Sequence, residues 1–393
     1  MSIETDENKI LDTNGDNGPT KNLLLISLAN GLSLSFIALF WLIGVYIVEK
    51  SLIGEISFIL SLSTLFSGTA QLGLGMAKMT LYPRSCDESV REDFDAIALA
   101  GAILAMIILS AATGKPQVYG IIVFSQVAFG MAAYDMLALR QYKHFSLWMI
   151  ATRLMQLCTG IALLILNLDA NLIALGYTVP LLVFAPRFLR NSWVGLGKFS
   201  FGHIKENFGL TMHLSAISIL RTYVGYLDKV IVGLFLGFVL LGEYQFVYQV
   251  YTMLQFFPLS VFSNFVPEMS SGKNRMATWK PFLGGVLLCL LAFLGAKPAV
   301  DLLLPAYSET VTTIYFVILS VLPATLSSVF ASDLITNKKT GFLLAAYVVS
   351  FAGQYCTIIF LTTILGLIGV GISLLIGQLF LLASTTISLY FKK

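Results

Sequence analysis

The sequence predicts an all-α membrane protein with about twelve transmembrane helices, arranged as two parallel six-helix repeats around a central cavity. Its 393 residues are 57% hydrophobic and only 11% charged, whereas a soluble domain carries about 25% charged residues. This composition leaves too few polar side chains to cover a soluble globule, and its hydrophobicity excludes a disordered chain. The lengths of the apolar runs and an internal repeat are the other two observations behind the prediction.

Apolar runs long enough to span a membrane recur along the whole chain, since a helix needs about 20 apolar residues to cross the hydrocarbon core. In the first half they are Leu23–Val48, Leu52–Met76, Ala96–Thr113, Gln117–Leu139, Leu147–Leu168 and Asn171–Pro186. In the second half they are Phe208–Leu236, Glu243–Phe265, Pro281–Leu304, Thr310–Ser332, Gly341–Thr363 and Gly366–Tyr390. These runs predict twelve spans.

The basic residues are distributed unevenly around these spans. With both termini inside, 18 of the 24 Lys and Arg residues fall on the inner side, three fall on the outer side and three lie within spans. An excess of Lys and Arg marks cytoplasmic loops. We therefore expect a multi-pass protein of the plasma (inner) membrane with both termini in the cytoplasm.

A short motif recurs at a distance of 188 residues. Residues 54–58 open the second span as GEISF, and residues 242–246 open the eighth span as GEYQF. Because the two copies are six spans apart, both halves enter the membrane in the same direction, and transporters built this way bind substrate near the midplane between the halves. The repeat predicts an N-terminal lobe over residues 23–206 and a C-terminal lobe over residues 207–393. The acidic, polar residues 1–22 are expected to form a disordered cytoplasmic tail.

Motifs for enzymatic chemistry are missing from the sequence. Lys198 follows a glycine without the rest of a P-loop, and no G-x-S-x-G run occurs. Neither the four cysteines nor the three histidines have the spacing of a metal site. We therefore expect a protein that is not an enzyme, with no catalytic residues, no metal site, no cofactor and no nucleic-acid partner.

Five ionisable residues stand out inside the predicted spans, where an unpaired charge is costly and marks a candidate functional site. Arg221 lies near the middle of the seventh span, and its planar, permanently charged fork suits a phosphate, so we predict that it binds an anion in a cavity. The alternative is an ion pair with Asp228, which lies two turns later on the same face. Lys229 is a further candidate for substrate binding, but Asp228 and Lys229 would also form a local pair, with Asp228 in a coupling or structural role.

The other two charges lie nearer the cytoplasmic side. Arg153, in the fifth span, either lines the inner mouth of a cavity and binds substrate or extends to the membrane interface. Asp135, near the end of the fourth span, is expected to pair with Arg140 or Arg153. A proton or sodium site at Asp135 is the alternative.

Several runs occur in the order and spacing of a known transporter family. They are Gly54-Glu55-x-x-Phe58 and Gln71-Leu72-Gly73-Leu74-Gly75 in the second span, Leu139-Arg140-Gln141 after the fourth, Asp228-Lys229-Val230-Ile231-Val232-Gly233 in the seventh, Pro267-Glu268-Met269-Ser270 after the eighth, Pro305-Ala306-Tyr307 after the ninth and Gly366-Leu367-Ile368-Gly369-Val370-Gly371 before the twelfth. In these runs the chain resembles the polysaccharide-biosynthesis (O-antigen-type) flippases, which are lipid-linked oligosaccharide transporters of the multidrug/oligosaccharidyl-lipid/polysaccharide exporter superfamily.

The resemblance implies a flippase that moves a polyprenyl-pyrophosphate-linked oligosaccharide from the cytoplasmic to the outer face by alternating access, for cell-surface glycan assembly. Arg221 and Arg153 would contact the pyrophosphate or acidic sugars. The implied partners are this glycan, membrane lipids, and a glycan polymerase or other assembly proteins. A drug/cation antiporter of the same superfamily is the alternative, although many of those carry an acid in the first helix, where this chain has Asn30. A membrane-embedded sugar transferase or polymerase is the third reading.

Overall fold

A computed structural model describes residues 19–85, 87–198, 205, 208–270, 279–336 and 339–390, which are almost entirely helical and contain no strand. The first half contains α2 (Pro19–Ile47), α3 (Lys50–Gln71), α4 (Leu74–Ser85), α5 (Glu88–Thr113), α6 (Pro116–Ala138), α7 (Tyr142–Ile165), α8 (Ala170–Thr178), the 3₁₀ helix η2 (Val179–Phe184) and α9 (Ala185–Lys198). The second half contains α11 (Phe208–Leu236), α12 (Phe238–Ser270), α13 (Trp279–Leu303), the 3₁₀ helix η4 (Pro305–Thr310), α14 (Val311–Thr336), α15 (Thr340–Leu365) and α16 (Leu367–Tyr390).

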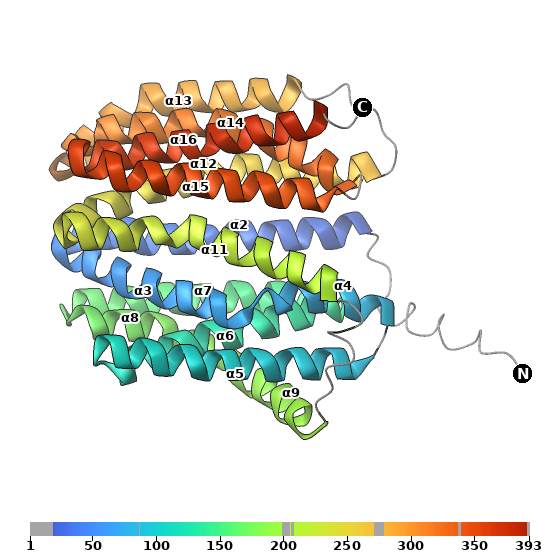
Figure 1. The fold of residues 1–393 in the computed structure, drawn as a ribbon. Coiled ribbons are helices and arrows are strands. Elements are labelled where there is room, and N and C mark those ends of the chain that lie inside the picture. Colours follow the sequence, from blue (N-terminus) through green and yellow to red (C-terminus); the bar gives the residue numbers. More distant parts are fainter. Residues whose placement is uncertain are drawn as a thin grey trace, which may run out of the picture.

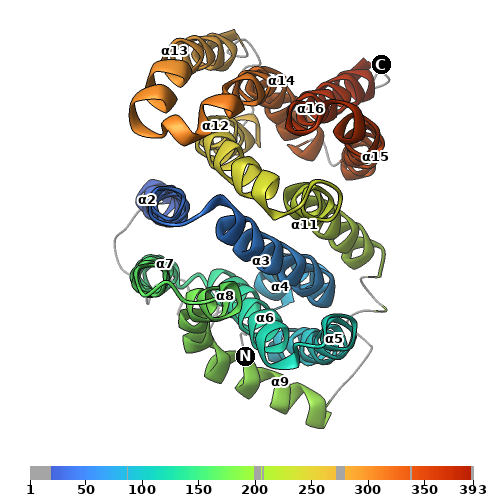
Figure 2. The ribbon, with the colours of Figure 1, turned by 90° about the vertical axis from the view of Figure 1, so that its left-hand side faces the viewer.

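The helices form two bundles that lie side by side (Figures 1 and 2). In the N-terminal bundle, α2–α9, helix α2 contacts α7, and α5 contacts α6 and α9. In the C-terminal bundle, α11–α16, helix α16 contacts both α14 and α15. Helix α3 joins the two, because it contacts α5 and α6 of its own bundle and α11 and α12 of the other. Any movement of one bundle against the other must therefore change the packing around α3.

All twelve predicted spans are present as helices. Ten stretches of the described residues are long and apolar enough to cross a membrane. Helices α11 and α12, with 29 and 33 residues, are long enough as well, but α11 carries charged residues and α12 carries several Tyr and Gln residues that lower their hydropathy. The prediction of an all-α membrane protein with about twelve helices is confirmed.

Some helix ends differ from the predicted span ends for local reasons. Helix α5 begins at Glu88, well before Ala96, because the side chain of Asp87 caps it by accepting a hydrogen bond from the backbone N–H of Ser89. Helix α3 ends at Gln71 because Leu72 and Gly73 adopt positive φ angles of 46° and 64°, which break the helix before α4.

The predicted tail and lobe boundary fall mostly on undescribed residues. Residues 1–18 of the predicted 1–22 tail lie outside the described residues, and α2 already begins at Pro19. The boundary between residues 206 and 207 also lies outside them, in the connection between α9 and α11.

Helices α3 and α12 cross each other near their first turns, and the crossing follows the sequence repeat. A Cβ atom added to Gly54 would overlap the carbonyl oxygen of Phe238, and one added to Gly242 would overlap the carbonyl oxygen of Lys50. Phe238 and Gly242 lie 188 positions after Lys50 and Gly54, so the contact is reciprocal, as at an interface between two equivalent units.

Polar contacts hold the same crossing together. Ser57 donates a hydrogen bond of 2.8 Å to Gln245, its own equivalent 188 positions later. The ammonium group of Lys50 lies 2.7 Å from the carboxylate of Glu243 and 4.8 Å from the ring centre of Tyr307. Both helices thus begin at the same end of the molecule, opposite the start of α2 and the end of α16, which supports the parallel relation of the two halves (Figure 1).

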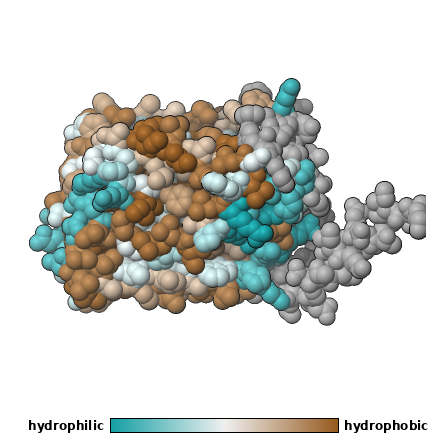
Figure 3. Space-filling view, turned by 90° about the horizontal axis from the view of Figure 1, so that it is seen from below, coloured by the Kyte–Doolittle hydropathy of each residue, from teal (hydrophilic) through white to brown (hydrophobic). Residues whose placement is uncertain are grey.

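The outer surface is largely apolar. Figure 3 shows hydrophobic side chains across the middle of one face and hydrophilic side chains gathered towards its two ends. Exposed aliphatic residues lie on helices such as α5 and α13; they include Ile103, Leu104, Ile107, Ile108, Leu287, Leu290, Leu291 and Leu294. An apolar surface of this extent on helices of spanning length is typical of a chain surrounded by lipid.

Candidate functional site

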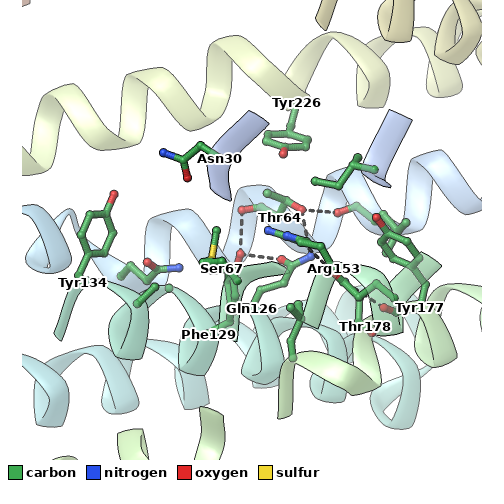
Figure 4. A pocket seen from close by; sticks show the side chains of 18 of the residues that line it. Asn30, Thr64, Ser67, Gln126, Phe129, Tyr134, Arg153, Tyr177, Thr178 and Tyr226 are labelled. Atoms are coloured by element: carbon green, nitrogen blue, oxygen red, sulfur yellow. Dashed lines mark hydrogen bonds between the residues drawn. The ribbon is translucent and has the colours of Figure 1, made fainter. Parts of the chain in front are cut away.

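A cavity of about 520 Å³ lies within the N-terminal bundle and is closed on one side by α11 (Figure 4). Its polar lining residues come from α2, α3, α6, α7 and α8; they are Asn30, Thr64, Ser67, Gln71, Gln126, Arg153, Gln156 and Thr178. Aromatic lining residues are Trp41, Phe129, Tyr134, Phe145, Tyr177 and Tyr226. This mixture of hydrogen-bonding groups and aromatic rings inside an otherwise apolar bundle is typical of a ligand site.

Arg153 is the charged residue of this cavity. Its Nη1 donates a hydrogen bond of 2.6 Å to Gln156, and its guanidinium carbon lies 4.8 Å from the ring centre of Phe129. Its buried Nε has no hydrogen-bond partner among the described residues. The described lining contains no Asp or Glu, so the positive charge of Arg153 is not neutralised within the cavity.

A short hydrogen-bonded row fixes the polar wall next to Arg153. Ser67 donates to the side-chain oxygen of Gln126 at 2.8 Å, and the amide of Gln126 donates to the hydroxyl of Thr64 at 3.1 Å. Helices α3 and α6 are therefore joined by side chains that would otherwise be unsatisfied in lipid. The wall presents preformed donors and acceptors to a bound molecule.

Arg221 is exposed on α11 and forms no ion pair with a described residue. It lies outside the described cavity lining but acts electrostatically on Tyr134, which lines that cavity. The structure thus places Arg221 beside the cavity and Arg153 within it. The alternative pairing of Arg221 with Asp228 does not occur, because the carboxylate of Asp228 is bound elsewhere.

Asp228 and Lys229 form a buried pair in the C-terminal bundle, outside the described cavity lining. Their charged groups lie 3.7 Å apart, and the Lys229 ammonium donates a hydrogen bond of 2.7 Å to the carbonyl of Gly225. The hydroxyl of Tyr244 donates to the other oxygen of Asp228, and the Lys229 ammonium lies 3.2 Å from the ring centre of Tyr248. The two charges of this pair are thus satisfied by each other and by neighbouring groups of α11 and α12.

Asp135 is fully buried at the centre of an ion network near the end of α6. Its carboxylate accepts hydrogen bonds of 2.7 Å from Nε of Arg91 and 2.7 Å from Nε of Arg187, and lies 3.8 Å from the ammonium of Lys78. The sequence-based choice of Arg140 or Arg153 as its partner is wrong, because the partners come from α4, α5 and α9. The carboxylate is thus held by three cations of the chain.

Two sets of residues escaped the sequence analysis. The first is this ion network, to which Asp95 also belongs because it accepts a hydrogen bond of 2.5 Å from Lys78. In the sequence, the three basic residues of the network, Lys78, Arg91 and Arg187, look like ordinary residues of cytoplasmic loops. The second is the polar cavity wall with Thr64, Ser67 and Gln126. Polar residues repeated on one face of an apolar span were the available signal for it.

The sequence matches no protein-family model and no curated protein sequence. Among solved structures, the chain is similar to a lipid II flippase MurJ in an inward closed conformation, with a TM-score of 0.70 and 13% identity over 93% of this chain and 87% of that one. It is also similar to the eukaryotic MATE transporter AtDTX14, with a TM-score of 0.57 and 14% identity over 95% and 96% of the two chains. An inward-facing multidrug resistance MATE family transporter of the MOP superfamily has a TM-score of 0.59 and 12% identity over 94% and 93%.

The solved structures are described as those of a flippase and of transporters. The predicted fold is confirmed: this chain is a multi-pass membrane protein with the fold that the lipid II flippase and the MATE transporters share.

Proposed function

We propose that the protein is a flippase that carries a polyprenyl-pyrophosphate-linked oligosaccharide from the cytoplasmic to the outer face of the membrane by alternating access between its two bundles. The main support for this proposal is the positive charge of the cavity. Arg153 lies in a lining that contains no carboxylate among its described residues. A cation that lines a cavity without a carboxylate partner in the described lining favours an anionic substrate, because a phosphate can accept hydrogen bonds from the guanidinium and offset its desolvation.

A second arginine, Arg221, lies beside the cavity. Arg221 is exposed on α11 and acts on Tyr134 at the cavity wall. Arg221 would offer an anion a second cationic contact beside the cavity, and moderate attraction at two sites suits a substrate that must also be released. Lys229 is buried against Asp228 and Tyr248, so its predicted contact with substrate would require a different arrangement of α11.

The polar wall and the apolar exterior fit the two parts of such a substrate. Amides, hydroxyls and aromatic rings line a volume of about 520 Å³, within the range of about 300–1,000 Å³ that is usual for ligand sites. The exposed aliphatic surface of the helices remains in contact with lipid, as a prenyl chain would. A cationic drug, in contrast, would be repelled by Arg153 and would find no carboxylate in the described lining.

The test is transport by the purified protein in liposomes. A fluorescent farnesyl-diphosphate-linked disaccharide is placed in both leaflets, and its exposure outside is followed by enzymatic modification. We expect transport by the unmodified protein, a loss of at least about tenfold in Arg153→Ala, and partial recovery in Arg153→Lys, which keeps the charge but not the planar fork. Arg190→Ala, on α9 and outside the cavity lining, is the matched control.

Two results would overturn the proposal. The first is efflux of a cationic dye against a proton or sodium gradient that survives Arg153→Ala, which would indicate a drug/cation antiporter. The second is formation of a longer glycan from the lipid-linked probe without any transport, which would indicate a transferase or polymerase. In cells lacking the protein, complete lipid-linked glycan should accumulate on the cytoplasmic face.

A further inference from the structure

We propose that Tyr226 is the residue through which the C-terminal bundle contacts the substrate, and that its ring stacks on the sugar attached to the diphosphate. The inference rests on the proposed function and adds a residue that selects for the sugar. Tyr226 is the lining residue that α11 supplies, whereas the other described lining residues come from the N-terminal bundle.

The side chain of Tyr226 is available for this contact. It projects from α11 towards Thr64 and Arg153 in Figure 4. It is 37% exposed and has no hydrogen bond to a described residue, although it lies deep between two bundles. An aromatic ring that leaves part of its surface open to a cavity is suited to cover a ligand.

Tyr226 also lies between the cations of the two bundles. It interacts electrostatically with Arg153, and the ammonium of Lys229 lies 4.8 Å from its ring centre. Lys229 therefore supports the ring on the side of the C-terminal bundle, while Arg153 lies on the side of the cavity. A diphosphate held by Arg153 would place its first sugar next to the ring of Tyr226.

The chemistry of the two groups is complementary. A pyranose ring has an apolar face of C–H groups that packs on an aromatic ring, and its hydroxyls can hydrogen bond to the amide of Gln126 and the hydroxyl of Thr64 on the wall opposite. Pairs of aromatic rings contribute about 0.5–1.5 kcal/mol beyond the buried area, and we take the same order of magnitude for a sugar face on the ring of Tyr226. That range corresponds to a change in affinity of up to about tenfold.

The experiment compares two probes on the purified full-length protein. Farnesyl diphosphate carries the anion alone, and farnesyl diphosphate linked to one N-acetylglucosamine carries the sugar as well. Binding is followed by tryptophan fluorescence, since Trp41 lines the cavity. The variants are Tyr226→Ala and Tyr226→Phe, with Tyr46→Ala as control because Tyr46 is 77% exposed at the end of α2 and outside the cavity.

We expect the unmodified protein to bind the sugar-bearing probe up to about tenfold more tightly than the bare diphosphate. Tyr226→Ala should lose this preference while its affinity for the bare diphosphate stays unchanged, a split that a purely structural role would not produce. Tyr226→Phe, which keeps the ring, should retain the preference.

The failures of the two proposals are distinguishable. If both probes bind the unmodified protein and Tyr226→Ala keeps the preference for sugar, the role of Tyr226 is overturned and the flippase proposal stands. If neither probe binds the unmodified protein, or if Arg153→Ala binds both as tightly, the proposed function fails and the role of Tyr226 fails with it.

Discussion

Arg153 and Lys229 are both cations inside membrane-spanning helices, one in each bundle, but their surroundings differ. Lys229 has a carboxylate 3.7 Å away, a carbonyl at 2.7 Å and an aromatic ring beneath its charge. Arg153 has a neutral amide, an aromatic ring and a buried Nε without a partner among the described residues. The chain thus neutralises one buried cation by itself and leaves the other to face a cavity.

The difference indicates which charge serves the fold and which serves a ligand. Removing one member of a buried ion pair leaves an uncompensated charge, whereas removing an unpaired cation relieves a desolvation penalty. Stability and transport should therefore respond in opposite ways to changes at the two sites. The following predictions test this contrast in order of decreasing effect.

The largest effect is expected for Asp228→Ala, which leaves Lys229 buried without its carboxylate. The free energy of unfolding should fall by about 3–5 kcal/mol, measured by denaturant unfolding in detergent. Arg153→Ala is the matched variant and should change it by less than about 1 kcal/mol. The double variant Asp228→Ala/Lys229→Met should recover most of the loss, and equal losses in the two single variants would contradict the contrast.

The second effect concerns the crossing of α3 and α12, which joins the two bundles near the first turns of these helices. A methyl group at Gly54 overlaps the backbone of Phe238, so Gly54→Ala should force the helices apart and destabilise the fold by about 1–3 kcal/mol. Disulfide formation between cysteines introduced at positions 50 and 243 should fall in the same variant. Gly295→Ala on α13, where no atom lies within 4 Å of the added methyl, should change neither quantity.

The third prediction concerns Gln156→Glu, a substitution that gives Arg153 a carboxylate neighbour like the one that Lys229 has. Gln156 accepts a hydrogen bond from Arg153 at 2.6 Å, so Gln156→Glu would give the guanidinium its own carboxylate. Transport of the lipid-linked probe should fall at least about tenfold, because the substrate anion now competes with an internal one. The change also removes the hydrogen bond of 2.9 Å that the Gln156 amide donates to the carbonyl of Tyr177, so the free energy of unfolding should fall by about 1–3 kcal/mol. Unchanged transport would show that Arg153 does not bind the substrate.

The smallest effect is expected for Tyr244→Phe, which removes one hydrogen bond to Asp228 and leaves Lys229 in place. The loss of stability should be about 1 kcal/mol, measured by unfolding in detergent. Transport should stay at the level of the unmodified protein. A transport defect larger than the stability loss would assign the C-terminal pair a role in the transport cycle.

The sequence predicted the spans better than the site. Each span could be found from its own apolar length, and the repeat predicted two halves. That the two copies of the repeated motif meet at the crossing, as the contact between Ser57 and Gln245 illustrates, became visible only in the structure. The partners of Asp135, in contrast, could not be predicted from its neighbours in the sequence. Its neighbours in the sequence, Arg140 and Arg153, are not its partners, since Arg91 and Arg187 lie 44 and 52 positions away and reach it only through the packing of three helices.

The sequence by itself determined that this chain is a helical membrane protein with about twelve spans in two repeated halves, because hydrophobic length and a repeated motif are local properties of the chain. Only the tertiary structure decided which intramembrane charges are neutralised. Arg153, Arg221, Asp228 and Lys229 look alike in the sequence, as polar residues in apolar helices. The packing of α12 encloses Lys229 and its sequence neighbour Asp228 with Tyr244 and Tyr248, whereas Arg153 faces a cavity whose described lining has no carboxylate.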